Sequence, residues 1–545
     1  LMAEFQGFRS QYLKGSRGET AGEQEKWFYE YNWNMKSRAD QELVRNPGDY
    51  LPSPNAIGEQ VKETIAEINA LPEQTRYYTQ YEPRQYKLTI GYICHALREL
   101  GMNFAAGSEI NVKELIKEFG VVSEHHRLFY HIFKLLKDAG VVSGEKDSYR
   151  VVDKPEFRDL KSWIQELNEH YPEFRHETTL LGRCGPEIAG VLTGEVDPIQ
   201  LIFPEDQWDL IVKYYVEGFA FKKYNDLAAR VVSELIERVP EDQNLRILEI
   251  GAGTGGMTQA VLPLLPAGRT EYFYTDLSHM FMLKAQQRFA RYPFVQYKLL
   301  DIEKDLVEQG FDIHSFDLVI ASDVIHATRD LKTSLGHVKG LLASEGILMM
   351  LEVTNSPVYL DFIFGMTEGW WLFEDTDIRP DHATMGPERW KRVLEREAFA
   401  DVAVYSDFEK NDVSCQSVIL ARNEKLDLSN KVLEESPKLG LADWLIFADE
   451  SGVAAQIQSR LAVLEKQSTL VSRGLEFREI SETAFEIDPS SQEDVNHLIN
   501  RMIQKENFQG IIFLWGLDSV PNEQLNTPTI IQAEDHSSRT LLNVM

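Results

Sequence analysis

The sequence predicts an α/β fold whose central part is a sheet of parallel strands with helices on both faces. Two observations predict it. Short apolar, β-rich runs alternate with helical stretches over residues 245–422, and the first run leads directly into a glycine-rich turn. The chain has 545 residues, well beyond the roughly 250–300 at which a single core stops growing, so roughly three to four structural units are expected.

The first 240 residues are expected to form two of these units. Residues 1–80 are interpreted as a polar linker with one aromatic strand, Trp27–Trp33, and a helix over residues 56–71. Residues 81–240 are mostly helical, because Arg127–Leu136 places apolar side chains at three- and four-residue spacing. A predicted hairpin over residues 141–152 makes this region resemble a winged helix. DNA binding is one interpretation of that shape, and a packing or lid module is the other.

The remaining residues are expected to form two further units. Residues 241–425 hold the alternating pattern, and its last two strands are expected to pair as a hairpin. Residues 426–545 begin a second α/β pattern, with strands at residues 444–448, 469–471 and 510–515 and a helix at residues 453–464. The strands expected in the first of these units are Arg246–Ile250, Glu271–Thr275, Val295–Lys298, Phe316–Ser322, Ile347–Val353, Val402–Tyr405 and Ser417–Ala421.

Composition excludes several functions. The chain carries 56 basic and 86 acidic side chains, a net charge of -30, which disfavours nucleic acid and anionic membranes and supports the lid interpretation above. Three separated cysteines and thirteen scattered histidines indicate a reduced, cytoplasmic protein without a disulfide frame or a metal site. No apolar run is long enough to span a membrane, and the ends suggest a piece excised from a multidomain chain.

The glycine-rich turn is the strongest functional motif. An apolar strand, Ile247–Ile250, is followed by Gly251, Gly253, Gly255 and Gly256 and then by a helix. Glycines let the backbone turn tightly and approach a ligand closely. The spacing also satisfies the G-x-G-x-x-G pattern, which by itself suits a dinucleotide as well. Glu249, just before the turn, completes an E-x-G-x-G-x-G pattern that favours S-adenosylmethionine.

Acidic residues after the next two strands point to the same cofactor. Asp276 ends the second strand, where its carboxylate could bind ribose hydroxyls, and Asp301 follows the third, where it could accept from the adenine amino group. Leu277, Ile302 and Ser322 are expected to line the same site. Together, in this order, these residues resemble a class I methyltransferase with a Rossmann-like core. A dehydrogenase of the Tyr-x-x-x-Lys type would need that pair downstream of the turn, whereas the pair in this sequence, Tyr130 and Lys134, lies upstream in an expected helix.

The tips of the fourth and fifth strands supply a candidate catalytic pair. His326 follows the fourth strand and Glu352 lies near the end of the fifth. In the class I order these strands are neighbours, so both side chains are expected beside the cofactor's methyl group. A histidine can remove a proton near neutral pH, and a carboxylate on its other nitrogen fixes its tautomer.

The residues around His326 suggest a family. Ser322–Asp330 resembles the histidine motif of C-methyltransferase domains in modular polyketide synthases. Residues 180–186 and 197–204 are similar to that family's helical lid, and residues 369–373 to its stretch after the fifth strand. The resemblance covers about residues 85–425 and implies that His326 and Glu352 form a catalytic dyad.

The resemblance also implies a reaction and partners. S-adenosylmethionine would be converted to S-adenosylhomocysteine without a metal. The methyl group would go to the α-carbon of a β-ketoacyl or malonyl-type thioester on the phosphopantetheine arm of an acyl carrier protein. That carrier and other domains of the same synthase would be the partners. Rival interpretations are an O- or N-methyltransferase acting on a small molecule, a catalytically decayed scaffold, and a winged-helix nucleic-acid binder.

The flanking regions and one loop add two further expectations. Trp27–Trp33, Asp443–Gly452 and Phe513–Asp518 resemble a ketoreductase structural subdomain, which implies that the methyltransferase is inserted in a truncated, non-catalytic ketoreductase-like domain. Asp381–Thr384 departs from relatives, which are often rich in serine and proline there. That loop is expected near the substrate, and His382 is expected to be a loop residue and not a catalyst.

Overall fold

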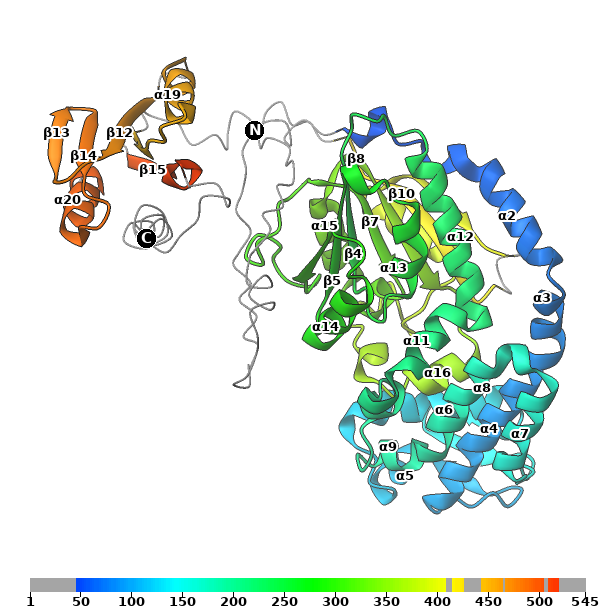
Figure 1. Ribbon diagram of the computed structural model, residues 1–545. Helices are drawn as coiled ribbons and strands as arrows, with labels where there is room; N and C mark the ends of the chain where they lie inside the picture. The colour runs from blue at the N-terminus through cyan, green and yellow to red at the C-terminus, as the bar shows by residue number, and fades with distance from the viewer. Residues whose placement is uncertain (1–45, 408–413, 426–442, 464–465, 504–507, 519–545) are drawn as a thin grey trace, which may run out of the picture. The chain divides into compact units, whose positions relative to one another are not determined.

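The chain divides into two compact units, residues 1–426 and 427–545. The computed structural model describes residues 46–407, 414–425, 443–463, 466–503 and 508–518 (Figure 1). The strand predicted at Trp27–Trp33 lies outside the described residues. Among the described residues, no helix is long and apolar enough to cross a membrane.

A seven-stranded mixed sheet forms the centre of the first unit. Its strand order is β6-β5-β4-β7-β8-β10-β9, and the first five strands run parallel. Strand β10 pairs antiparallel with both β8 and β9, as the predicted hairpin requires. All seven predicted strands are confirmed, although β8 begins at residue 342 instead of 347. The bounds are β4 Leu245–Ile250, β5 Thr270–Asp276, β6 Val295–Leu299, β7 Phe316–Ser322, β8 Leu342–Val353, β9 Ala400–Tyr405 and β10 Gln416–Arg422.

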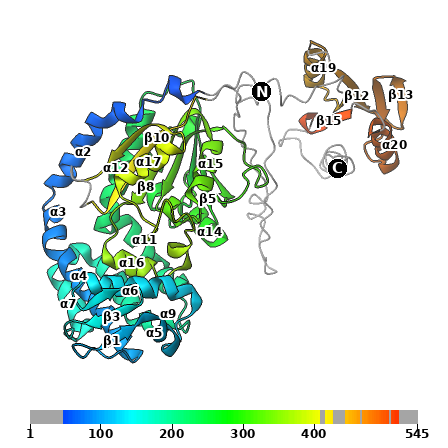
Figure 2. The same cartoon turned by 180° about the vertical axis from the view of Figure 1, so that it is seen from behind.

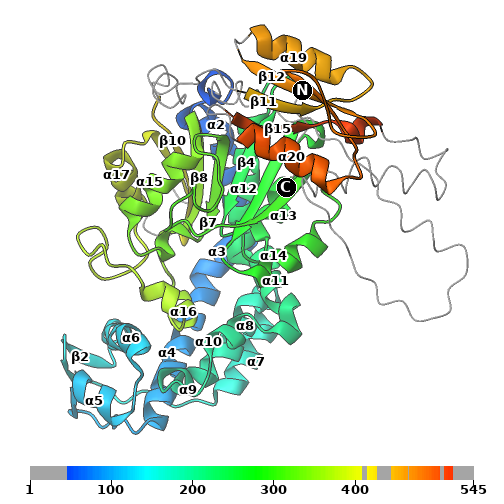
Figure 3. The same ribbon diagram turned by 90° about the vertical axis from the view of Figure 1, so that its left-hand side faces the viewer.

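Helices cover both faces of this sheet, which confirms the predicted α/β class (Figure 3). Side chains of β4 alternate between two cores. Ile247 belongs to the core beneath α12 (Phe219–Ile236), α13 (Gly256–Val261) and α14 (His279–Arg288), whereas Leu248 belongs to the core beneath α15 (Leu331–Leu341) and α17 (Pro387–Arg396). A strand buried on both faces is mostly apolar, and β4 is apolar except for the buried Arg246 and Glu249.

A helical region, residues 82–217, lies beyond one end of the sheet (Figure 2). It includes the predicted hairpin, as strands β2 and β3 of a three-stranded antiparallel sheet of order β1-β3-β2. Helix α6 is amphipathic as predicted and buries Leu128, Phe129, Ile132 and Phe133. The bounds are α4 Glu82–Glu99, β1 Glu109–Asn111, α5 Val112–Glu118, α6 His126–Asp138, β2 Val142–Glu145, β3 Ser148–Val151, α7 Leu160–His170, α8 Arg175–Cys184, α9 Ile188–Leu192, α10 Pro198–Ile202 and α11 Trp208–Glu217.

Two segments join the sheet to the helical region. Helix α16 (Val358–Phe364) follows β8 and packs on α4 and α8. On the outside, α2 (Gly58–Ala70), α3 (Pro72–Arg76) and η4 (Tyr77–Tyr81) run from the sheet toward α4 (Figure 1). This outer segment is anchored by a buried ion pair, Lys223 to Asp407 at 2.6 Å, to which Gln74 also bonds. Helix α2 matches the predicted helix, whereas the boundary predicted at residue 80 remains a prediction.

The second unit contains a five-stranded sheet of order β13-β14-β12-β11-β15. Strand β11 pairs in parallel with β12 and β15, and β13 is the antiparallel edge. The predicted strands at residues 444–448, 469–471 and 510–515 and the helix at 453–464 are confirmed, while β13, β14 and α20 were not predicted. The bounds are β11 Asp443–Phe447, α19 Val453–Val463, β12 Gln467–Arg473, β13 Arg478–Ser481, β14 Ala484–Ile487, α20 Gln492–Ile503 and β15 Phe508–Phe513.

Candidate functional site

The predicted site residues lie at the carboxyl ends of five neighbouring parallel strands. Strand β4 leads into the glycine turn, β5 ends at Asp276, β6 is followed by Asp301, β7 ends at Ser322, and Glu352 lies one residue from the end of β8. Because β6, β5, β4, β7 and β8 are adjacent and parallel, these ends meet at one edge of the sheet. Ligands of open α/β sheets bind at such an edge.

The glycine turn requires glycine for two different reasons. Gly251, Gly253 and Gly255 have φ angles of 57°, 55° and 75°, a region that other residues adopt at a cost. A Cβ on Gly251 would lie 2.6 Å from Val324 Cγ2, and one on Gly255 would lie 2.7 Å from Phe289. A Cβ on Gly253 would meet only the Gly251 carbonyl oxygen, at 3.7 Å. Gly251 and Gly255 therefore allow close packing, whereas Gly253 faces open space that a ligand could occupy.

Asp276 supports the turn directly. Its Oδ2 accepts a hydrogen bond from the Gly253 N–H at 2.9 Å, and its Oδ1 accepts one from the Ser278 N–H at 2.7 Å. Burial raises the pKa of Asp276. Each carboxylate oxygen has a second lone pair, so Asp276 can still accept from a ligand hydroxyl. The adjacent Leu277 is 70% exposed, which leaves an apolar side chain available beside this acid.

Glu249 carries an oxygen that lacks a protein partner. Its Oε2 accepts from Thr258 Oγ1 and Tyr272 Oη, both at 2.5 Å, whereas the buried Oε1 has no hydrogen bond. Burial raises the pKa of Glu249 to about 7. A buried acceptor without a partner is costly unless a ligand or water supplies a donor. Together with the open side of Gly253, this oxygen fits a ligand with hydrogen-bond donors, as S-adenosylmethionine is.

The other predicted cofactor residues occupy the same edge. Asp301 Oδ1 accepts from the Glu303 N–H at 3.0 Å, and its Oδ2 lies 3.0 Å from Lys304 Nζ. The carbonyl of Ile302 accepts from His337 Nδ1 at 2.6 Å. Ser322 is half-buried at the tip of β7. Their roles toward a cofactor remain predictions.

His326 and Glu352 are in direct contact. Nδ1 of His326 lies 2.5 Å from Glu352 Oε2, and Glu352 Oε1 accepts from the Ile325 N–H at 3.0 Å. Both side chains are buried, with 3% and 0% of their surface exposed. Because a carboxylate accepts at Nδ1, the proton of the neutral ring lies there and Nε2 keeps a lone pair. Burial lowers the pKa of His326, but Glu352 and Asp323 outweigh it, so the net shift is upward.

Asp323 is a neighbour that the sequence analysis did not identify as a site residue. It has a φ of 53°, and its two oxygens accept from the Val353 N–H at 3.0 Å and from Gln416 Nε2 at 2.9 Å. Burial and the negative charge of Glu352 raise its pKa to about 7. Asp323 thus braces the strand tip beside the dyad. The spacing of Asp323 and His326 in the sequence does not by itself predict this role.

Arg379 and Trp370 hold His326 from two sides. Arg379 is fully buried and donates to the carbonyls of His326 and Thr328, both at 2.7 Å, while its Nε bonds Asp375 Oδ1 at 2.6 Å. The ring of Trp370 packs edge-on against the His326 ring, with centroids 5.2 Å apart. Neither role was predicted, because both residues reach His326 from a loop some fifty positions away.

Comparison with known proteins defines the class of enzyme to which this chain belongs. Residues 248–348 match the family described as a methyltransferase domain. The crystal structure of the CurJ carbon methyltransferase shares 34% identity with this chain and a TM-score of 0.66, and the match covers 69% of this chain and all of that one. The citrinin polyketide synthase CMeT domain shares 28% identity and a TM-score of 0.62, covering 69% of this chain and all of that one. These similarities define a class I, S-adenosylmethionine-dependent methyltransferase.

The curated relatives narrow the assignment. The non-reducing polyketide synthase pigA of Monascus ruber is 31% identical over 377 residues, which is 66% of this chain and 14% of that synthase. This chain belongs to the carbon methyltransferases of polyketide synthases. It spans about one seventh of the length of the curated relatives that it matches.

Proposed function

We propose that this chain methylates the α-carbon of an acyl thioester, a β-ketoacyl or malonyl-type group on the phosphopantetheine arm of an acyl carrier protein. His326 is the base and Glu352 orients it. One observation carries the proposal: Glu352 takes the Nδ1 side of the buried His326 ring, so Nε2 is left as the proton acceptor.

The proton transfer follows from this geometry. Nε2 of His326 takes a proton from the α-carbon, and the electrons of that C–H bond form the thioester enolate. Glu352, already at Nδ1, stabilises the imidazolium that results. Bound S-adenosylmethionine supplies an electrophilic methyl group for the enolate carbon. Arg379 and Trp370 keep the histidine aligned during this step.

The cofactor is proposed to lie over the glycine turn. Glu249, Asp276 and Asp301 offer acceptors, Leu277 and Ile302 offer apolar contact, and Ser322 borders the methyl end. Gly251, Gly253 and Gly255 let the backbone of the turn come close to the cofactor. The open space above Gly253 and the unpartnered Oε1 of Glu249 support this assignment. We propose that the reaction uses no metal, as the family resemblance implies.

The synthase context is also part of the proposal. The relatives named as polyketide synthases are far longer than this chain, so other synthase domains are proposed partners. Residues 426–545, whose described part forms a mostly parallel sheet, are proposed to be the non-catalytic ketoreductase-like fragment, and residues 1–80 are proposed to be its first part. Residues 81–240 are proposed to be a lid and residues 241–425 the methyltransferase core. Three free cysteines suit a cytoplasmic protein.

The experiment that tests this function combines the full chain, S-adenosylmethionine and a β-ketoacyl carrier protein. Mass spectrometry of the released acyl group and NMR then locate the added methyl. The expected product carries it on the α-carbon. A methyl on oxygen or nitrogen would indicate the rival methyltransferase, whereas cofactor that never binds would indicate a decayed scaffold.

A further inference from the structure

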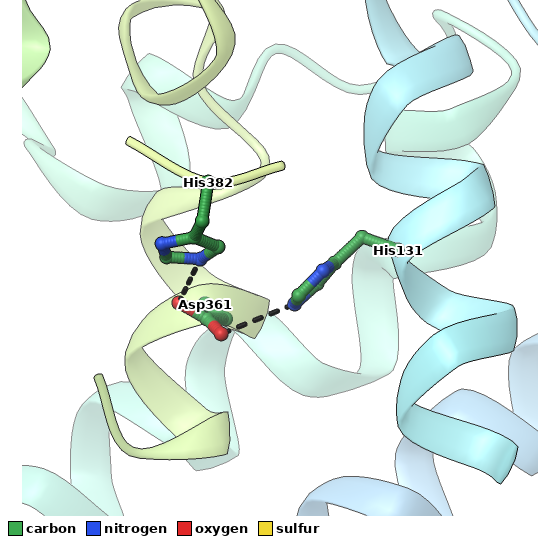
Figure 4. Close-up of side chains that lie close together, drawn as sticks. All are labelled: His131, Asp361 and His382. Carbon is green, nitrogen blue, oxygen red and sulfur yellow. Dashed lines mark hydrogen bonds and ion pairs between the residues drawn. The ribbon is translucent and has the colours of Figure 1, made fainter. Parts of the chain in front are cut away.

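A second group of titratable side chains lies close to the dyad, with one buried carboxylate between two partly buried histidines. His131 on α6, Asp361 on α16 and His382 in the loop before α17 place their polar atoms within 4.8 Å of one another (Figure 4). His131 Nε2 lies 3.1 Å from Asp361 Oδ2, and His382 Nε2 lies 3.0 Å from Asp361 Oδ1. We call these three residues the histidine clamp. It joins the helical region, the helix after β8 and the loop that departs from relatives.

We infer that the histidine clamp is a positioning device for the methyl-transfer reaction, which fixes the helical region against the segment that holds His326. This inference rests on the proposed function. The segment concerned, residues 361–382, carries Trp370, which contacts the His326 ring, and Arg379, which donates to the His326 carbonyl. A displacement of this segment would therefore displace the base.

Helix α6 contacts residues 361–382 at a second point, through Arg127. Arg127 donates to the carbonyls of Trp371 and Phe373, the latter at 2.9 Å. Arg127 and His131 are four residues apart, so they lie on one face of α6. The same face that anchors Asp361 thus anchors the backbone next to Trp370.

Aromatic packing connects the clamp to the dyad. The His131 ring contacts Trp371 at 5.2 Å, and His382 contacts both Trp371 at 5.9 Å and Trp370 at 6.0 Å. Trp370 in turn packs on His326 at 5.2 Å. Both tryptophans are nearly buried, and interiors packed this closely transmit displacement.

The hydrogen bonds favour a clamp over a metal site, although two histidines and one carboxylate are a common ligand set. The Thr384 N–H donates to His382 Nδ1 at 3.1 Å, so the ring proton of neutral His382 lies on Nε2 and is donated to Asp361. A metal ion on Nε2 would break the bond to Asp361 and move the ring proton to Nδ1. The bond from the Thr384 N–H would then be lost, and Nδ1 would have Thr384 Oγ1, at 2.8 Å, as its acceptor. Asp361 Oδ1 also accepts from Ser356 Oγ at 2.5 Å. Burial raises the pKa of Asp361, but the two histidines outweigh it and keep the carboxylate charged.

The test uses the full chain with His131→Ala, His382→Ala, the double variant and His382→Gln, which keeps an N–H donor. His126→Ala is the matched control, because His126 lies on the same helix and its ring hydrogen-bonds the nearby Val121 carbonyl, at 3.2 Å, instead of residues 361–382. Hydrogen exchange is measured without substrate. His382→Ala is expected to speed exchange in α6, and His131→Ala is expected to speed exchange in residues 380–386, because coupling is reciprocal.

Kinetics then test the link to the reaction. His382→Ala is expected to lower kcat about tenfold or more, with cofactor Kd within about twofold, and His382→Gln is expected to restore most of the loss. Normal kcat in His382→Ala, exchange changes confined to the mutated segment, or additive effects in the double variant would overturn the inference. So would stoichiometric Zn²⁺ binding that His382→Ala abolishes. If wild type methylates no acyl thioester while the reciprocal exchange holds, the proposed function fails and the clamp stands.

Discussion

At the scale of single residues, the account depends on Nε2 of His326. The Glu352 contact at Nδ1 is the reason that this nitrogen is free to take a proton. His326→Ala is therefore expected to lower turnover by at least about 100-fold, the lower end of what a general base contributes. Cofactor binding should persist, since the glycine turn is intact. Isothermal titration with S-adenosylhomocysteine and a turnover assay on one preparation measure both, and near-normal turnover would exclude His326 as the base.

Glu352 should set the pH at which this base works. His326 accepts a proton only when neutral, and its net pKa is raised above the ordinary value of 6.5. The rate should therefore rise with pH through a value above 6.5. Glu352→Gln removes the negative charge at Nδ1, so the rising limb should move to lower pH while the plateau falls. The measurement is kcat/KM against pH, and an unmoved limb would contradict the assigned role of Glu352.

The contact between His326 and Glu352 could be predicted, whereas most of the contacts that position His326 could not. Two strand tips that are neighbours in a parallel sheet bring their side chains together, so strand order was enough for the dyad. Arg379 and Trp370 come from an irregular loop without periodicity, and only tertiary packing shows where such residues point. His382 was predicted to be a loop residue, and the structure also places it in a hydrogen bond to the buried Asp361.

At the scale of elements, the glycine turn is the feature that cofactor binding depends on. Gly253→Ala should cost about 1–2 kcal/mol of stability, because its φ of 55° disfavours a side chain. Its Cβ would enter the space above the turn, so affinity for S-adenosylhomocysteine should fall by at least about tenfold. Titration calorimetry and a melting curve separate the two effects. Gly268→Ala is the matched control, since a Cβ there meets nothing within 4 Å and φ is not positive. Unchanged affinity in Gly253→Ala would place the cofactor elsewhere.

Elements were predictable in proportion to the regularity of their pattern. The strands of the central sheet are short β-rich runs between helical stretches, and α6 buries one apolar face, so both were identified. Strands β13 and β14 were not, because each has only four residues, too few to show a clear alternation. Strand β13 is an exposed edge strand, whereas β14 lies between β13 and β12 and buries Phe485 and Ile487. The extension of β8 to Leu342 pairs with β7 beyond a register shift, which the sequence does not signal.

At the scale of the whole molecule, the chain has two units with separate cores. A ligand that binds one folded unit stabilises that unit, by about 2.7 kcal/mol at a free concentration 100 times its Kd. We expect calorimetry of the full chain to show two transitions, of which S-adenosylhomocysteine shifts only one. Asp276→Ala, which removes the acceptor beneath Gly253, should reduce that shift. A single transition would mean that the units unfold together, and a shift of both transitions would mean that the cofactor site is not confined to one unit.

The central claim, that His326 removes the α-proton, can be measured without methyl transfer. The full chain is incubated in D₂O with S-adenosylhomocysteine and a thioester whose α-proton exchanges slowly on its own. NMR follows the loss of that proton. We predict exchange well above the enzyme-free rate for the wild type and exchange at the enzyme-free rate for His326→Ala. Equal acceleration by both proteins would contradict the claim.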